Sequence, residues 1–231
     1  MNEKDIPFIL RAENSDQSPA KLPGEGERIG TDDMGKIFYI MGKSATGKDT
    51  IYQELLERKE LGLNRLIPYT TRPIRAKETE GVEYHFVGEE KLQEFLDKGR
   101  VIELREYDTI HGIWKYFTVD DETMDLEKQD YLAIGTLVSY GRMVEYYGKN
   151  RVIPIYIEVE DGERLERALK REKKQTVPKY EELCRRFLAD QKDFSDQKLE
   201  AAGIGHRFSN NGDRQQCMEA AAAYILSQKE A

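Results

Sequence analysis

A lysine on a glycine-framed loop is the group in this sequence whose surroundings most clearly suggest chemistry. Glycine tolerates backbone conformations that other residues avoid, so a loop framed by Gly42 and Gly47 can turn its N–H groups toward one point. Those donors, the start of the following helix and the Lys48 ammonium together suit phosphate oxygens. The loop fits the phosphate-binding signature G-x-x-x-x-G-K-S/T up to Lys48 and departs from it at Asp49. The candidate binding residues are Gly42, Lys43, Ser44, Ala45, Thr46, Gly47, Lys48, Asp49 and Thr50.

The segments on either side of the loop support phosphate binding. Residues 36–41 are apolar and rich in β-branched and aromatic side chains, which predicts a buried strand. Residues 48–60 place their apolar side chains on one helical face. A chance match is the alternative, because loops are rich in glycine and lysine. The order strand, loop, helix disfavours it.

Two arginines around a proline form the second candidate site. Arg72 and Arg75 are three residues apart on a segment that the proline stiffens. Two guanidinium groups held in this way can give bidentate bonds to a phosphate, and the Tyr84 hydroxyl can add a donor. The alternative is a solvated basic turn paired with Glu78 and Glu80, and this segment taken alone favours that alternative.

The elements that must position these groups alternate along the chain from residue 36. Strands are predicted at 36–41, 66–69, 84–87, 101–104, 131–134 and 152–157, and helices at 48–60, 89–98, 137–147, 161–172, 180–194 and 213–228. Such alternation predicts an α/β fold with a mainly parallel sheet, whose ligands lie beyond the carboxyl ends of the strands. Residues 70–118 interrupt it and are predicted to form an inserted lobe. Residues 1–35, which are polar and contain several prolines, are predicted to be a flexible extension.

Composition limits the classes of function. A chain of 231 residues with 39% hydrophobic and 35% charged residues predicts one large domain, or a small core with lobes, with a densely charged surface. The net charge of −8 argues against a nucleic-acid binder but allows an anionic ligand in a local cationic cleft. No apolar run approaches membrane-spanning length and no signal-like block begins the chain, so we expect a cytoplasmic protein without a membrane partner.

Other polar residues are expected to have structural roles. Asp190 and Asp193, three apart in a predicted helix, should lie on a solvated face. Cys184 and Cys217 form neither a disulfide framework nor a metal-ligand spacing, and we expect reduced thiols. The histidines likewise lack metal spacing.

Together, the two candidate sites resemble those of the guanylate kinase family. The pattern T-T-R-x-x-R-x-x-E-x-x-G-x-x-Y-x-F runs from Thr70 to Phe86, and in combination with the glycine loop it is specific to that family. The resemblance covers about residues 36–211. It implies a P-loop NTPase-type parallel-sheet core flanked by helices within 36–231, with a monophosphate-binding lobe at about 70–118 and a helical lid at about 168–186. The implied activity is ATP-dependent phosphorylation of a nucleoside monophosphate, with GMP converted to GDP.

The resemblance also implies roles for individual residues. The GMP site would consist of Arg72, Arg75, Tyr84, Glu103, Tyr116 and Thr118, with Glu103 accepting from the guanine base. The ATP site would consist of residues 42–50 and Asn210, with Mg²⁺ held by Asp49. The implied catalytic residues are Lys48, Arg72, Arg171 and Arg186, of which the last two belong to the lid.

Two departures from the family pattern leave alternatives open. Asp49 replaces the usual Ser or Thr, although a carboxylate is also a hard oxygen ligand for Mg²⁺. Positions that help to recognise guanine in the family are Ile134 and Thr136 here, and an early serine appears as Pro68 or Tyr69. The acceptor could therefore be another nucleotide or a sugar phosphate. A noncatalytic guanylate-kinase-like binding module is the other alternative, which the retained lysine disfavours.

Overall fold

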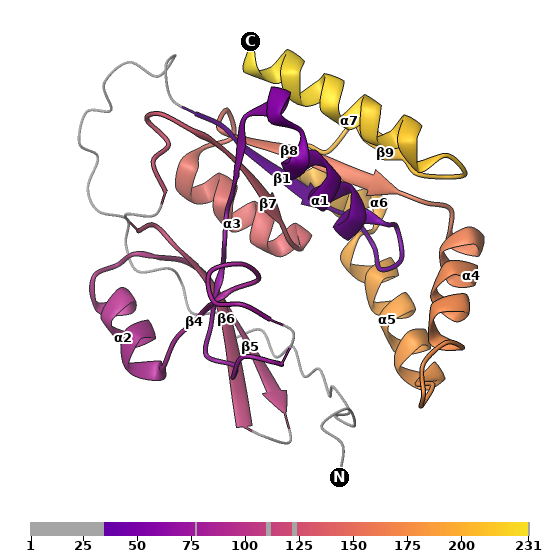
Figure 1. Ribbon diagram of the computed structural model, residues 1–231, viewed down its shortest axis with the longest axis horizontal. Coiled ribbons are helices and arrows are strands. Elements are labelled where there is room, and N and C mark those ends of the chain that lie inside the picture. Colours follow the sequence, from indigo (N-terminus) through magenta and orange to yellow (C-terminus); the bar gives the residue numbers. More distant parts are fainter. Residues whose placement is uncertain (1–34, 77, 110–111, 122–123, 231) are drawn as a thin grey trace. The chain divides into compact units, whose positions relative to one another are not determined.

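The computed structural model describes residues 35–76, 78–109, 112–121 and 124–230 (Figure 1). They belong to two compact units, each of which is described by itself. One unit contains the described residues between Leu66 and Asp125, and the other contains Gly35–Arg65 and those from Leu126 onward. Apart from Gly35, the predicted N-terminal extension lies outside the described residues.

A five-stranded sheet forms the centre of the larger unit, and every pairing in it is parallel. The order across the sheet is β2 (Leu63–Arg65), β7 (Asp130–Ile134), β1 (Ile37–Met41), β8 (Val152–Glu158) and β9 (Arg207–Ser209). The central strand β1 is buried along its whole length, which explains why its sequence is continuously apolar. The predicted α/β architecture with a parallel sheet is confirmed.

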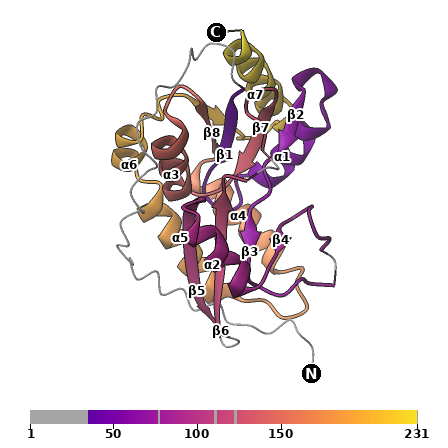
Figure 2. The ribbon, with the colours of Figure 1, turned by 90° about the vertical axis from the view of Figure 1, so that its left-hand side faces the viewer.

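Helices cover both faces of this sheet (Figures 1 and 2). Phe38 and Ile40 of β1 belong to a core with α1 (Lys48–Glu57) and α7 (Arg214–Lys229), while Tyr39 contacts Tyr140 of α3 (Leu137–Tyr147) on the opposite face. This alternation follows from the period of two along a strand. The unit also contains the short 3₁₀ helix η1 (Lys59–Leu61), α4 (Asp161–Glu172), α5 (Tyr180–Asp193) and α6 (Asp196–Ala201).

The smaller unit is a four-stranded sheet with one helix on one face. Its order is β4 (His85–Phe86), β3 (Tyr69–Thr70), β6 (Gly112–Val119) and β5 (Val101–Thr109), with β3 and β4 parallel and the other pairings antiparallel. Helix α2 (Glu89–Asp97) packs Leu92 and Phe95 against Phe117 of β6. Because the helix takes the apolar side chains, the opposite face can carry polar groups.

Two strand predictions differ from the structure. The strand expected at 66–69 is wrong apart from Tyr69, because the sheet contacts are made by β2 before it and by β3 after it. The strand expected at 101–104 continues to Thr109 and pairs with β6, which was not predicted. Among the described residues, no helix combines the length and the apolar character needed to cross a membrane.

Candidate functional site

The glycine loop between β1 and α1 is shaped by contacts that exclude side chains at both framing glycines. Gly47 has a left-handed backbone, with φ of 82°, and a Cβ there would lie 2.8 Å from Nδ2 of Asn210. A Cβ on Gly42 would lie 2.4 Å from the carbonyl oxygen of Ile157. Within the described ranges, no side chain caps the start of α1. The first N–H groups of the helix are therefore oriented to receive an anion.

Lys48 and Asp49 begin this helix and differ sharply in exposure. The Lys48 side chain is 19% exposed, that of Asp49 is 83% exposed, and Lys48 Nζ lies 3.6 Å from Asp49 Oδ2. The described residues contain no group of three or more side chains that could hold a metal ion. Asp49 could therefore supply one carboxylate to a magnesium ion whose other ligands are phosphate and water oxygens, which is how Mg²⁺ is usually bound.

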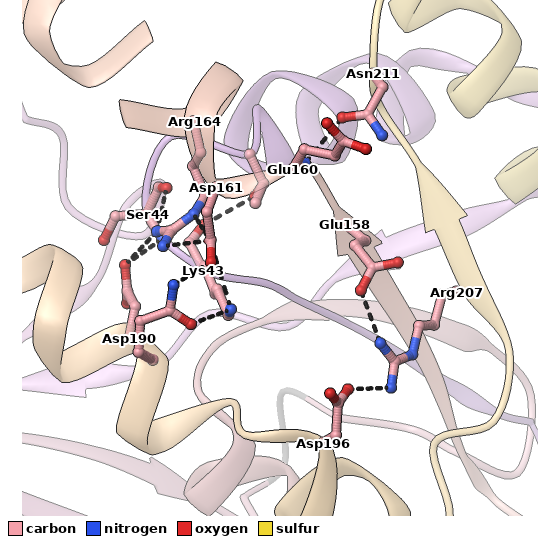
Figure 3. Close-up of polar contacts among 12 residues, drawn as sticks. Lys43, Ser44, Glu158, Glu160, Asp161, Arg164, Asp190, Asp196, Arg207 and Asn211 are labelled. Atoms are coloured by element: carbon pink, nitrogen blue, oxygen red, sulfur yellow. Dashed lines mark hydrogen bonds and ion pairs between the residues drawn. The ribbon is translucent and has the colours of Figure 1, made fainter. Parts of the chain in front are cut away.

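Behind the loop lies a buried arginine that the sequence did not reveal. Arg164 of α4 is 1% exposed, and its Nη1 donates to the Ser44 carbonyl at 3.1 Å and to Asp190 Oδ2 at 3.0 Å (Figure 3). The same carboxylate oxygen accepts from the Ser44 N–H at 2.8 Å. The guanidinium also lies 4.4 Å from the centre of the Phe187 ring. The prediction that Asp190 is solvated is wrong, whereas Asp193 is exposed as predicted.

The Lys43 side chain contacts the same two helices, α4 and α5, and these contacts occupy the ammonium that could otherwise bind phosphate. Its Nζ donates to Gln191 Oε1 at 2.6 Å and lies 3.6 Å from Asp161 Oδ1, which also accepts from Arg164 (Figure 3). Burial disfavours the charged form of Asp161, but hydrogen bonds from Gln191 and Arg164 together with the charges of Lys43 and Arg164 outweigh it and lower the pKa of this carboxyl. The side chain of Lys43 therefore anchors the loop, and only its backbone is available to a ligand.

Asn210, which follows β9, braces the other side of the loop. The residue is 2% exposed, its Nδ2 donates to the Thr46 carbonyl at 2.7 Å, and its N–H donates to the Glu158 carbonyl at 2.8 Å. Its Oδ1 is buried without a hydrogen-bond partner among the described residues. The predicted ATP-site residue is thus in direct contact with the loop.

Arg171 of α4 and Arg186 of α5 line one cavity. The cavity measures about 160 Å³ and is also lined by Ser44 of the glycine loop. Both guanidinium groups belong to exposed residues, and within the described part of the chain neither is paired with a carboxylate. Lys179 adds a further cation to the lining, and Glu172 and Glu182 add two carboxylates. The two predicted lid arginines therefore stand close to the glycine loop with their hydrogen-bond donors available to an anion.

In the smaller unit, Arg72 is buried and held from two sides. Its Nη1 and Nη2 donate to the Glu78 carboxylate at 2.9 and 2.8 Å, and its Nε donates to the Tyr116 hydroxyl at 3.1 Å. Burial is the largest single influence and would lower the pKa of Arg72, but the hydrogen bonds and charge interactions with Glu78 and Tyr116 together outweigh it, and the pKa is raised. The bond from Arg72 lowers the pKa of Glu78. The alternative of a solvated turn paired with Glu78 and Glu80 is right about Glu78, whereas Glu80 accepts from the Phe86 N–H at 2.8 Å. It is wrong about solvent at Arg72, which is buried, and right at Arg75, which is exposed.

Glu103 on β5 is buried and accepts from two side chains. Arg105 donates its Nε to Oε2 at 2.9 Å and its Nη2 to Oε1 at 3.2 Å, and the Thr118 hydroxyl donates to Oε1 at 3.1 Å. A register shift between Val101 and Glu103 reverses the alternation of the strand. Val101 consequently packs toward the α2 side, while Glu103 lies on the opposite face. The sequence reasoning missed Arg105, which no local motif marks.

The hairpin of β5 and β6 gathers the predicted acceptor residues on that opposite face. Glu103 is opposite Thr118 in the pairing, and Arg105 is opposite Tyr116. Tyr116 in turn contacts the Tyr84 ring at 5.5 Å between centres and accepts from Arg72. Of the six predicted acceptor residues, only the exposed Arg75 side chain makes no such contact among the described residues.

Comparison with known proteins identifies the family of this chain. The family model described as guanylate kinase matches residues 34–197. The chain belongs to the guanylate kinase family. Three curated guanylate kinases illustrate the sequence similarity. That of Malacoplasma penetrans is 40% identical over 73 residues, or 32% of this chain and 37% of that protein. That of Mycobacterium leprae is 39% identical over 80 residues, or 35% of this chain and 36% of that protein. That of Porphyromonas gingivalis is 29% identical over 126 residues, or 54% of this chain and 65% of that protein.

The aligned part of the chain thus spans between about a third and two thirds of these guanylate kinases. A solved structure shows the same fold over more of the chain. The guanylate kinase from Anaplasma phagocytophilum superposes with a TM-score of 0.58 at 19% identity, covering 86% of this chain and 88% of that one. The predicted P-loop NTPase-type fold is therefore confirmed.

Two of the positions where this guanylate kinase family member departs from the family pattern, Thr136 and Tyr69, have local structural roles. The Thr136 hydroxyl caps α3 by accepting from the Ser139 N–H at 3.2 Å. Tyr69 is buried against Phe117 and donates its hydroxyl to Asp121. Burial is the main cause that raises the pKa of Tyr69. These side chains are committed to folding contacts, so the Glu103 end of the hairpin is the best candidate for recognising a base.

Proposed function

We propose that the protein transfers a phosphoryl group from ATP to a nucleoside monophosphate, with GMP as the acceptor. The observation that carries the proposal is a fully formed glycine loop that retains Lys48 at the uncapped start of α1, in a chain of the guanylate kinase family. Scaffold modules that only bind have no need of this arrangement. The proposed domain extends over 36–231, with the lobe at about 70–118 and the lid at about 168–186.

ATP would bind with its phosphates on the N–H groups of residues 42–48. Lys48 would neutralise the β and γ oxygens, and Asn210 would lie near the adenine side of the loop. Asp49 is the residue that would hold Mg²⁺, directly or through water, and the ion would neutralise charge on the polyphosphate. Such transfers depend on alignment and charge neutralisation more than on covalent chemistry.

The acceptor would be held by the polar face of the β5–β6 hairpin. Arg72, Tyr84 and Tyr116 form a contiguous group of donors that suits a monophosphate, with Arg75 free in orientation to close over it. Glu103 would accept from N1–H and N2–H of guanine, and Thr118 would support the same edge. A carboxylate acceptor favours guanine over adenine, whose N1 carries no hydrogen.

Arg171 and Arg186 would stabilise the group in transfer. Both line the cavity beside the glycine loop and neither is paired with a carboxylate among the residues described. Donors placed where negative charge develops lower the barrier, and closure of α4 and α5 over the phosphates would exclude water that otherwise hydrolyses ATP. We also propose a cytoplasmic location, where ATP and purine monophosphates are both available.

A coupled assay across acceptors tests the proposal. With ATP and Mg²⁺, we expect ADP release with GMP and dGMP to exceed that with AMP, UMP and ribose phosphates. A higher rate with one of the other compounds would identify that compound, rather than GMP, as the acceptor. Absence of turnover with every compound would indicate a noncatalytic binding module. Glu103→Gln should weaken GMP binding about tenfold or more and leave the KM for ATP within about twofold, because it replaces one of the two oxygens that would accept from the base by an N–H donor and leaves the glycine loop unchanged. Unchanged GMP affinity in this variant would show that Glu103 does not contact the base.

A further inference from the structure

The contact between Glu103 and Arg105 has the form of a base-recognition contact. Both donors come from one edge of the guanidinium, Nε at 2.9 Å from Oε2 and Nη2 at 3.2 Å from Oε1, so the two groups lie edge to edge. Guanine presents N1–H and N2–H on either side of C2, which is the same planar N–C–N pair of parallel donors. The Arg105 edge and the guanine edge therefore suit the same two acceptor atoms.

The oxygens of Glu103 cannot serve both partners at once. Oε1 has two lone pairs, and these accept from Nη2 of Arg105 and from the hydroxyl of Thr118. A base that needs both oxygens can bind only after the guanidinium leaves. We propose that Arg105 occupies the guanine subsite of Glu103 in the absence of acceptor and is displaced when GMP binds. This inference rests on the proposed function.

The burial of Glu103 explains why its carboxylate needs a cationic partner before GMP binds, and the partial exposure of Arg105 explains why that partner can move away. The Glu103 side chain is 4% exposed, and a buried carboxylate is strongly unfavourable unless a cation balances its charge, which the neutral Thr118 hydroxyl does not do. The Arg105 side chain is 28% exposed, so its charge keeps access to water when it leaves the carboxylate. The strand places Arg105 opposite Tyr116, next to the donors proposed for the phosphate. The displaced guanidinium would therefore remain beside an anion.

The expected effect follows from the population of the displaced state. If only a fraction of the molecules have Glu103 accessible, the apparent dissociation constant for GMP is the intrinsic value divided by that fraction. For a partly exposed charged hydrogen-bonded pair we take that fraction to be about one tenth. Removing the guanidinium should thus tighten GMP binding about tenfold, equivalent to about 1.4 kcal/mol.

The test is a calorimetric titration of GMP into the full chain without ATP. Arg105→Met keeps a long side chain and removes the donors, and we expect the dissociation constant for GMP to fall about tenfold. Arg142→Met is the matched control, because Arg142 is a partly exposed arginine paired with Glu145 on α3. It should bind GMP as the unaltered protein does. Unchanged or weaker binding in Arg105→Met would overturn the inference and show that Arg105 supports the base or the carboxylate.

A double-mutant cycle gives the decisive check. In a Glu103→Gln background, adding Arg105→Met should no longer tighten binding, because the competition requires the carboxylate. Equal tightening in both backgrounds would overturn the inference. Arg105→Lys serves if the methionine variant folds poorly, since an ammonium cannot match both oxygens and should tighten binding by a smaller factor. Failure of the unaltered protein to bind or phosphorylate GMP would instead overturn the proposed function.

Discussion

Lys48 stands where two sources of positive charge coincide. It is the first residue of α1, so its ammonium adds to the uncapped N–H groups of the helix, and its only ion pair among the described residues is with the exposed Asp49. Because this charge is already in place before ATP binds, it should stabilise both the bound phosphates and the negative charge that develops in the transition state. We expect Lys48→Ala to lower kcat about a hundredfold or more in the coupled assay.

Lys98→Ala provides the control for this prediction. Lys98 is an exposed lysine paired with Glu94 near the end of α2, so its loss should leave kcat unchanged. Near-normal turnover in Lys48→Ala would contradict the role of the glycine loop in phosphoryl transfer.

The Arg72–Glu78 pair predicts how stability depends on pH. Arg72 lowers the pKa of Glu78 in the folded protein, so the unfolded chain takes up the proton first as the pH falls. The stabilisation is therefore complete above the ordinary glutamate pKa, near about 4.3, and is lost as the pH falls through the lower folded value. We expect Glu78→Gln to reduce the free energy of unfolding by about 2 kcal/mol at pH 7, since it leaves buried Arg72 without its carboxylate.

Denaturant titrations from pH 7 to 3 measure this effect. The difference between the unaltered protein and Glu78→Gln should stay constant down to about pH 5 and shrink below about pH 4. Glu145→Gln, which removes an exposed carboxylate paired with Arg142, should change stability very little at any pH. A difference that does not depend on pH would show that Glu78 acts through packing rather than charge.

At the scale of elements, α4 and α5 are joined to the glycine loop by charges. Arg164 and Asp190 bond to each other and to the two backbone groups of Ser44, so the loop and both helices share one network (Figure 3). Asp190→Ala would leave the Ser44 N–H and part of a buried guanidinium without their acceptor. We expect a loss of about 3 kcal/mol in the free energy of unfolding and a KM for ATP raised several-fold.

Asp193→Ala is the control for the network, because this aspartate is on the same helix and is exposed. Denaturant titration and ATP kinetics of the two variants should separate them clearly. If Asp190→Ala behaves like Asp193→Ala, the network does not position the loop. Asp190→Asn should fall between the two, since the amide oxygen can still accept from the Ser44 N–H.

Elements with strong local signals could be predicted from the sequence. Helix α3 runs over the predicted 137–147 because Thr136 caps its start and Gly148, with φ of 90°, follows its end. The glycine loop was equally clear, and its two glycines are required, Gly42 by the Ile157 carbonyl and Gly47 by its left-handed backbone and the Asn210 side chain. The residue roles that family resemblance assigns to the site stay predictions.

Elements and contacts defined by distant partners could not be predicted. Strand β6 does not alternate polar and apolar side chains regularly, and its register is fixed by pairing with β5 and its bulge, so its short-range pattern is weak. Asp190 is shielded because Arg164, 26 residues away, turns toward it. Arg105 gains its partner from the same bulge, which turns Glu103 to the polar face. In each case the deciding contact lies outside any local window.

At the scale of the whole molecule, each unit carries one of the two proposed anion sites. The chain has a net charge of −8, so anionic substrates must be drawn by local clusters of cations rather than by the overall field. Arg171, Lys179 and Arg186 line one cavity in the larger unit, and the smaller unit offers the exposed Arg75, since Arg72 and Arg105 are paired with carboxylates. Each substrate should therefore protect a different part of the chain.

Amide hydrogen exchange with single substrates tests this division. ATP with Mg²⁺ should slow exchange in residues 42–50, and GMP should slow exchange in β5 and β6, because each ligand stabilises the contacts of the site that it occupies. At a concentration of about 100 times its dissociation constant, either ligand should also stabilise the folded chain by about 2.7 kcal/mol. The Lys48→Ala and Glu103→Gln variants should each lose protection by one substrate and keep protection by the other. Protection of the hairpin by ATP and of the loop by GMP would reverse the proposed assignment of the two sites.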